Sequence, residues 1–282
     1  MKKLSILLLI FLALASCEDV IEVDVPTEEP RLTVDAFMRI DTTDTAAPFF
    51  AEVKVGASSN FFGEVRPVQL EQITITNTAL NESIVLLETN PLSGIYRRNT
   101  SVEFMTSGEL LLQINYEGSR FAARTTYVPA VPIDKLEEGD GTLFSGEETE
   151  IVVAFTDAPN REDFYLFDFD FNEYLVTEDE FYPGQTFEFS YFYDDGLESG
   201  REVDISLIGV DEPFYNYMNQ LIVQAGGDQG PFQTPAATVR GNIINVTNID
   251  NTDNFDTIED PNNFALGYFA VCQTFSTSIT IE

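Results

Sequence analysis

The sequence contains no histidine and no tryptophan, only two cysteines, and 14 basic residues against 48 acidic ones. Without an imidazole, the chain cannot form a Ser-His-Asp triad, a His-ligated zinc site or a haem site with an axial His. With a net charge of −34, it also lacks the basic stripe that binding to nucleic-acid phosphates requires. Disorder is excluded as well, because the chain is 44% hydrophobic and its 24 Phe residues supply ample material for a core.

Residues 1–16 have the features of a lipoprotein signal peptide. Lys2 and Lys3 precede an apolar run, Leu4 to Leu14, which is shorter than the ~20 residues that cross a bilayer. The Leu-Ala-Ser-Cys sequence that ends at Cys17 resembles the bacterial lipobox, whose cysteine takes a diacylglycerol after cleavage of the leader. The resemblance implies lipidation of Cys17 and an outer-membrane anchor. The alternative is an ordinary secretory signal followed by a chance cysteine.

Residues 17–29 are expected to form an acidic tether. Four acidic residues follow Cys17 closely (Glu18, Asp19, Glu22 and Asp24). They resemble the surface-export signal of Bacteroidota lipoproteins, which implies a cell-surface location. The alternative is a flexible acidic linker without a sorting role. Once Cys17 is lipidated, Cys272 has no partner for an internal disulfide. We expect it to be a buried, inert thiol of the core.

The remainder of the chain alternates between apolar and polar residues at period two, which predicts an all-β, mainly β fold. Residues 30–130 are expected to form an immunoglobulin- or transthyretin-like β-sandwich. Its clearest element is a hairpin in which two alternating runs, 110–116 and 121–127, flank a Gly-containing turn. Residues 131–146 contain Pro132 and an acidic, Gly-rich stretch, and are expected to form a linker.

Residues 147–282 are expected to form a second β-rich domain with one helix. Two strands place four aromatic residues on one face, which predicts an aromatic core (Tyr165, Phe167, Phe169 and Phe171; Phe187, Phe189, Tyr191 and Tyr193). The alternative is a platform on which a ligand stacks. A helix near 212–225 is predicted by a capping Asp211, by Pro213 in its first turn and by two glycines after its end. Its apolar stripe is expected to cover a sheet face or the domain junction.

The order of several short motifs resembles that of a known family. The motifs are Val25-Pro26, Arg31 to Ala36, Ser93-Gly94-Ile95-Tyr96, the hairpin from Leu110 to Val128, Val131 to Asp134, Gly241-Asn242-Ile243, and Ala265 to Phe269. Together they resemble the domain-of-unknown-function 4249 family, lipoproteins of the Bacteroidota usually encoded beside TonB-dependent receptors. The resemblance implies an outer-membrane location and a receptor partner rather than an activity. This chain departs from the family pattern by an Asn- and Asp-rich insertion between Asn245 and Asn263.

Three sets of candidate site residues follow from the loops. Flexible, aromatic loops predict ligand binding at Tyr182, Asp194, Asp195 and Phe232. Hard oxygen donors predict a Ca²⁺ site at Asp250, Asp253 and Asp256, although the EF-hand spacing is not met and a solvated loop is the alternative. Short Asp-Thr motifs resemble the O-glycosylation sequence of exported Bacteroidota proteins, which implies modification at Thr42, Thr45 and Thr257.

These observations predict a surface-exposed outer-membrane lipoprotein that is not an enzyme. We expect a binding or accessory module, partnered with a TonB-dependent receptor in nutrient uptake, with no cofactor beyond that candidate Ca²⁺. One alternative is a hydrolase of glycans or peptides that uses carboxylates alone, with Asp168 and Asp170 or Asp194 and Asp195 as the acid–base pair. Another is a structural or adhesive surface protein.

Overall fold

Most of the chain forms strands, as the alternation at period two predicts. The computed structural model describes residues 29–43, 49–59, 63–143, 146–179, 183–194, 196–226, 237–249 and 263–282. The elements in these ranges are β1 (Leu32–Ile40), β2 (Phe49–Ala57), β3 (Arg66–Pro67), β4 (Gln72–Asn77), β5 (Glu82–Val85), β6 (Leu87–Glu88), β7 (Ile95–Thr100), α2 (Val102–Thr106), β8 (Glu109–Tyr116), β9 (Ser119–Val128), β10 (Ile133–Glu138), β11 (Thr149–Thr156), β12 (Phe164–Asp168), β13 (Tyr174–Glu178), β14 (Thr186–Tyr193), β15 (Glu202–Val210), α3 (Glu212–Gln224), β16 (Ile244–Asn245) and β17 (Leu266–Thr280). Neither helix is long and apolar enough to cross a membrane. The predicted hairpin is confirmed as β8 and β9.

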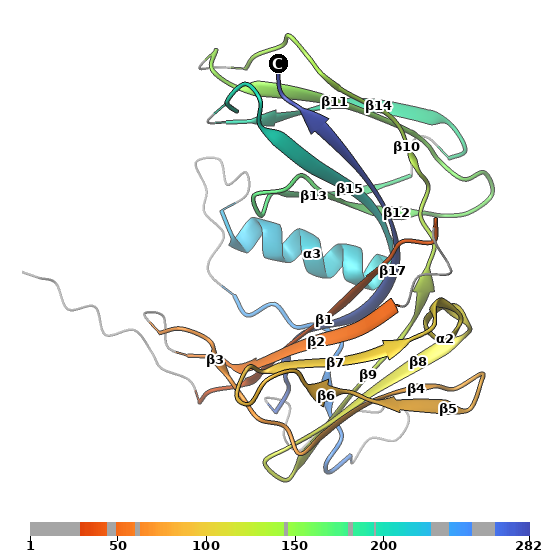
Figure 1. Cartoon of the computed structure of the whole chain (residues 1–282), viewed down its shortest axis with the longest axis vertical. Coiled ribbons are helices and arrows are strands. Elements are labelled where there is room, and N and C mark those ends of the chain that lie inside the picture. Colours follow the sequence, from red (N-terminus) through yellow and green to blue (C-terminus); the bar gives the residue numbers. More distant parts are fainter. Residues whose placement is uncertain are drawn as a thin grey trace, which may run out of the picture.

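One long strand, β17, joins the two halves of the molecule (Figure 1). Its first part pairs in parallel with β1, and Val271 and Cys272 also pair with β9. Its second part, from Thr274 to Thr280, pairs with β15. The main sheet has the order β5-β4-β8-β9-β17-β1-β2-β7-β6, with β15, β12 and β13 joined to it through β17. A single continuous strand therefore belongs to both halves.

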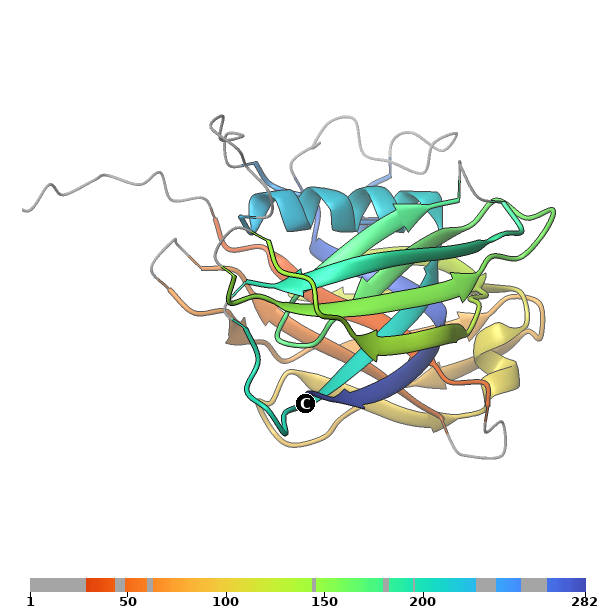
Figure 2. The ribbon, with the colours of Figure 1, turned by 90° about the horizontal axis from the view of Figure 1, so that it is seen from above.

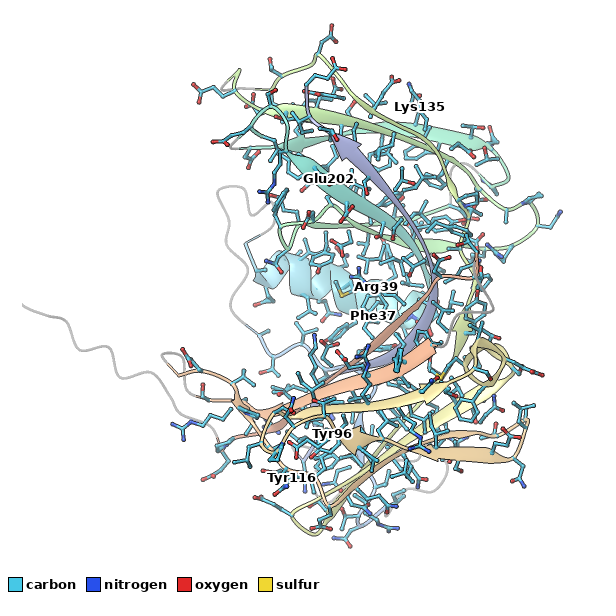
Figure 3. All side chains as sticks on the ribbon, in the orientation of Figure 1. Phe37, Arg39, Tyr96, Tyr116, Lys135 and Glu202 are labelled. Carbon is cyan, nitrogen blue, oxygen red and sulfur yellow. The ribbon has the colours of Figure 1, made fainter. Side chains whose placement is uncertain are left out.

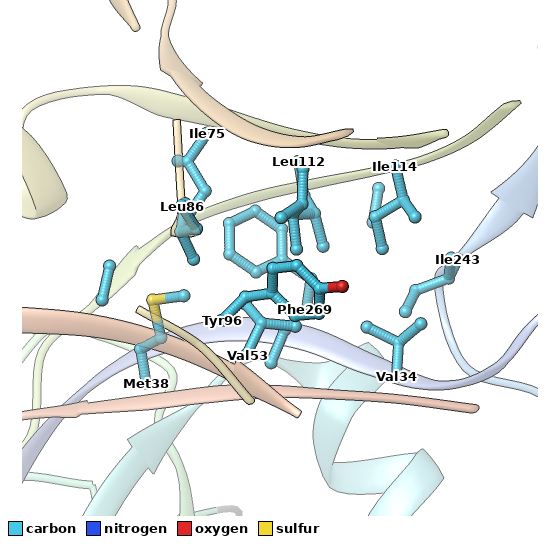
Figure 4. Close-up of a cluster of buried hydrophobic side chains, with 14 of the residues drawn as sticks. Val34, Met38, Val53, Ile75, Leu86, Tyr96, Leu112, Ile114, Ile243 and Phe269 are labelled. Atoms are coloured by element: carbon cyan, nitrogen blue, oxygen red, sulfur yellow. The ribbon is translucent and has the colours of Figure 1, made fainter. Parts of the chain in front are cut away.

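The first unit is the lower half in Figure 1, where the nearly closed main sheet surrounds an aliphatic core. Side chains from opposite walls meet in this core, among them Val34, Ile75, Leu112 and Phe269 (Figure 4). The immunoglobulin- or transthyretin-like topology expected for 30–130 is not confirmed. Although β16 and the first part of β17 lie within the range expected for the second domain, they pair with strands of the first unit.

The second unit, the upper half in Figure 1, has an aromatic core. A sheet of order β10-β11-β14 packs over β12, β15 and the end of β17. Tyr165, Phe167 and Phe169 are fully buried, which confirms the predicted core face. Phe167 meets Phe189 of the opposite layer edge-on, with ring centroids 5.2 Å apart. Full burial of a Phe side chain stabilises the fold by roughly 1.5–3 kcal/mol, so this cluster is a major source of stability.

The segment expected to be a linker contains a strand. Within 131–146, β10 pairs with β11 at the edge of the second sheet. The prolines Pro129 and Pro132 precede β10 and therefore interrupt no ladder. Pro129 also packs closely on Gly209, where an added Cβ would lie 2.1 Å from the Pro129 carbonyl oxygen.

Helix α3 forms where predicted. Figure 1 shows it between the two units, on the concave side of β17, and Figure 2 shows that it runs along one side of the molecule. The Asp211 side chain caps it by accepting from Phe214 N at 2.9 Å. Phe214 packs against Phe37 of β1 and Tyr268 of β17, with ring centroids 4.9 and 4.7 Å apart. Beneath the helix lies Cys272, whose burial raises the pKa of its thiol. The expected buried core thiol is confirmed.

Candidate functional site

Of the residues predicted to form sites, the structure describes Asp194 and Thr42, together with Asp168 and Asp170 of the hydrolase alternative. Asp194 is exposed just after β14. Thr42 is half-buried, and its Oγ1 accepts from Gln273 Nε2 at 2.6 Å. The other predicted residues lie outside the described ranges: Cys17, Tyr182, Asp195, Phe232, Asp250, Asp253, Asp256, Thr45 and Thr257. Lipidation, Ca²⁺ binding and glycosylation therefore stay predictions.

The turn between β12 and β13 has an unusual backbone. Three consecutive residues without a glycine among them, Asp170, Phe171 and Asn172, have φ values of 64°, 50° and 64°. Asp and Asn tolerate the left-handed conformation, but it costs of order 1–3 kcal/mol for a residue such as Phe171, and such conformations cluster at functional sites. The turn closes through Phe169 N to Glu173 O at 2.9 Å and Glu173 N to Asp170 O at 2.8 Å. The strain at Phe171 therefore favours a functional site beside this turn.

Contacts from three sides hold the turn in place. Tyr193 Oη donates to Phe169 O at 2.6 Å, and the Arg201 guanidinium lies 4.9 Å from the centroid of the Phe171 ring. Asp168 Oδ1 accepts from Asp170 N at 3.1 Å. Asp170 Oδ1 in turn accepts from Phe171 N at 2.8 Å, so both carboxylates have structural roles in the turn.

A cleft of about 660 Å³ lies beside this turn. We call it the α3 cleft. Its walls are the turn and the start of β13 (Asn172, Glu173 and Tyr174), the end of β14 (Tyr191, Phe192 and Asp194) and the second half of α3 (Met218, Leu221, Ile222 and Ala225). The predicted ligand residue Asp194 thus lies near the C-terminal end of α3. The apolar stripe of α3 therefore has two roles. Phe214, in the first half of the helix, covers the junction of the two units, and the apolar residues of the second half line the α3 cleft.

The polar groups of the α3 cleft are fixed by the aromatic core behind it. The Tyr191 hydroxyl donates to the Glu173 carboxylate, and burial together with this contact raises the pKa of Tyr191. The Tyr191 ring stacks on Phe169, with centroids 3.8 Å apart and planes 7° apart. Tyr191 therefore belongs to the core and to the cleft wall at once. Periodicity alone could not reveal this double role.

Two other features were missed by sequence reasoning. A hollow of about 690 Å³ lies where the chain enters the first unit, lined by Arg31, Tyr116 and Phe264 among others (Tyr116 is labelled in Figure 3). The guanidinium carbons of Arg31 and Arg240 lie 4.3 and 3.9 Å from the Phe264 ring centroid. Since these cations are engaged with this ring and acidic Glu29 and Glu117 also line the hollow, it is a weaker candidate than the α3 cleft.

The second feature is a buried carboxyl cluster at one end of the aromatic core. Asp157, Asp163 and Asp179 are 2%, 5% and 5% exposed. Tyr165 Oη donates to Asp157 Oδ1 at 2.6 Å, and Arg161 pairs with Asp163. Asp179 Oδ2 has no hydrogen-bond partner. Burial raises the pKa of both Asp163 and Asp179. No group of three or more Asp, Glu, Cys or His residues that could hold a metal ion occurs in the part of the chain that the structure describes.

The motifs around Gly241 and Gly267 meet in the first unit. Asn242 Nδ2 donates to Phe269 O and Asn242 Oδ1 accepts from Phe269 N, both at 2.8 Å, so this side chain pairs with β17 as a neighbouring strand would. A Cβ added to Gly241 would lie 1.7 Å from Gly267 O. A Cβ added to Gly267 would in turn lie 1.8 Å from Val34 O, so close backbone approach requires glycine at both positions.

Comparison with known proteins agrees with the motif order. No curated protein matches this chain. The model of one family, described as domain of unknown function (DUF4249), matches residues 18–278. Since this match covers nearly all of the chain, the protein belongs to the DUF4249 family.

Proposed function

We propose that this protein is a ligand-binding lipoprotein of the outer membrane, anchored through Cys17 at the cell surface, and that it serves a TonB-dependent receptor in nutrient uptake without catalysing a reaction. The observation that carries the binding role is the α3 cleft, where the strained β12–β13 turn, the end of β14 and the second half of α3 meet. The lipid anchor and the receptor partner rest on the leader and on the motif resemblance.

The cleft suits a small ligand or a short segment of a larger one. Its volume of about 660 Å³ falls within the ~300–1,000 Å³ typical of ligand sites. Apolar side chains from α3 supply most of one wall, and a few polar groups on the opposite wall would set the orientation of the ligand. A cavity that combines an apolar wall with a few polar groups is suited to binding a ligand.

The anchor would keep the cleft near a membrane partner. As the expected tether, the 13 residues from 17 to 29 would span at most about 45 Å when fully extended. A body held at that distance can contact a receptor embedded in the same membrane. The lipid would make the attachment durable, because each buried acyl CH₂ contributes about 0.8 kcal/mol.

Three measurements test the proposal. Labelled palmitate should appear on the wild-type protein and not on Cys17→Ala, and surface protease should reach the wild type on intact cells. Mild extraction of native membranes should recover an outer-membrane receptor with it. Absence of label, or a protein that protease reaches only after lysis, would overturn the anchor and surface location.

The role of the cleft is tested by filling it. Leu221→Trp would occupy the cleft, whereas Leu143→Trp, at a side chain that is 49% exposed in the second unit, is the matched control. Nutrient-dependent growth that needs this protein should fail with Leu221→Trp and persist with Leu143→Trp, at equal surface levels. Equal growth of both variants would contradict a binding role for the cleft.

A further inference from the structure

The α3 cleft runs along strand edges. Tyr191 and Phe192 are consecutive in β14 and face opposite sides of their sheet, yet both line the cleft. Tyr174, the first residue of β13, also lines the cleft, beside Asn172 and Glu173 of the turn that precedes the strand. Among the residues that the structure describes, β14 pairs only with β11, and β13 pairs only with β12. Each strand therefore presents an edge of backbone donors and acceptors, with which a peptide in an extended conformation can pair as an additional strand.

The side chains around these edges favour a cation. Glu173 and Asp194 are the charged residues among those lining the cleft, and both are acidic. Three rings, Tyr174, Tyr191 and Phe192, lie beside them, and the face of an aromatic ring attracts ammonium and guanidinium groups. The protein makes such a contact next to the cleft, where Arg201 lies over Phe171.

The charge of the whole second half acts in the same direction. Residues 31–130 contain eight basic and 11 acidic residues, whereas residues 131–282 contain four basic and 31 acidic ones. Lys135 (labelled in Figure 3) lies 2.7 Å from Glu137 and 3.0 Å from Glu188, and Arg161 pairs with Asp163. Arg201 and Arg240 lie over Phe rings. The resulting negative field would raise the association rate of a cationic ligand.

We propose that the α3 cleft binds an extended peptide segment that carries Lys or Arg, which adds as a strand to the edge of β14 and places a cationic side chain between Glu173, Asp194 and the aromatic wall. This inference rests on the proposed function and adds the class of ligand to it. Main-chain hydrogen bonds would supply affinity, and the acidic, aromatic wall would supply specificity.

The test uses the mature, full-length protein and four probes in titration calorimetry. These are a capped octapeptide of alternating Val and Lys, its Val and Glu counterpart, the Lys peptide with alternate amides methylated, and spermidine as a cation without a peptide backbone. The first should bind, and its affinity should fall as salt rises from 0.05 to 0.5 M. The Glu peptide should bind at least about tenfold more weakly, because like charges oppose it.

Variants assign the site. Asp194→Asn should weaken binding of the Lys peptide about fivefold, the upper end for an exposed ion pair, and Leu221→Trp should abolish binding. Glu202→Gln is the control, because it removes one negative charge from an exposed position of β15 in the same unit. Equal effects of Asp194→Asn and Glu202→Gln would overturn the cleft as the site. Unchanged binding of the methylated peptide, or equal binding of spermidine, would overturn strand addition.

The two proposals fail differently. If no Lys peptide binds while Leu221→Trp still abolishes nutrient-dependent growth, the cleft is a ligand site of another chemistry, and the peptide inference alone is wrong. If growth also survives Leu221→Trp, the proposed function fails with it.

Discussion

Arg39 Nη1 lies 2.6 Å from Asp168 Oδ2 and thereby joins β1 of the first unit to β12 of the second. Figure 3 shows Arg39 and Phe37 beside α3, at the junction of the two halves. The same Asp168 accepts from Asp170 N in the strained turn. One carboxylate thus connects the junction to the wall of the α3 cleft.

The pair should couple the two units measurably. Its side chains are 34% and 16% exposed, so we expect a coupling energy of about 1 kcal/mol, at the upper end for partly exposed ion pairs. A double-mutant cycle with Arg39→Ala and Asp168→Asn in urea measures it. The pair Arg124–Glu109, at 55% and 38% exposed, is the control and should give less. Equal coupling in both pairs would show that the junction pair has no special role.

The strained turn predicts an unusual substitution pattern at Asn172. Asn172→Gly should change the free energy of unfolding by less than about 0.5 kcal/mol, since Gly and Asn both accept φ near 64°. Asn172→Val should cost about 1–3 kcal/mol, because a β-branched residue is strained there. Urea unfolding of the two variants compares them. Equal stability of the Gly and Val variants would mean that the turn relaxes.

The buried carboxyl cluster predicts a stability that depends on pH. Burial raises the pKa of Asp179 above its ordinary 3.8, so the folded state favours the protonated carboxyl. The contribution of this group to stability is therefore full below pH 3.8 and is lost as pH rises through the folded pKa. Asp179→Asn stays neutral at every pH. It should be more stable than wild type at pH 7, by about 1 kcal/mol, and the difference should vanish below pH 3.8.

Thermal unfolding from pH 3 to 8 measures this difference, with Glu202→Gln as a control for general charge effects. The neighbouring groups Asp157 and Glu162 add to the repulsion that Asp179→Asn relieves, since both also raise the pKa of Asp179. A wild-type-like pH profile for Asp179→Asn would assign the pH dependence to another group.

The backbone contact at Gly267 predicts a large loss of stability. Gly267 has φ of 104°, and an added Cβ would lie 1.8 Å from Val34 O, so Gly267→Ala must separate β1 from β17. We expect a loss above about 3 kcal/mol. Gly118 is the matched control: its φ is 74° and nothing lies within 4 Å of an added Cβ. Gly118→Ala should cost only about 1 kcal/mol, the price of its backbone conformation. Chemical denaturation measures the unfolding free energy of both variants. Similar losses in Gly267→Ala and Gly118→Ala would show that the positive φ alone, and not the contact with Val34, causes them.

Local pattern predicted much of this protein. The alternation in 110–127 determined a hairpin, the aromatic rows of 165–171 and 187–193 determined a core face, and Asp211, Pro213 and Gly226 determined the limits of α3. These features succeed because a strand or helix is specified by contacts within a few residues of itself.

The tertiary structure decided what joins distant segments. Only the fold shows that β17 serves both units, that Asn242 pairs with Phe269 across the acidic insertion, and that Arg39 reaches Asp168. Likewise, the α3 cleft is formed by three elements whose apolar residues carry the same periodic signal as any core position. Strand partners and cavities depend on long-range packing, on which a period in the sequence carries no information.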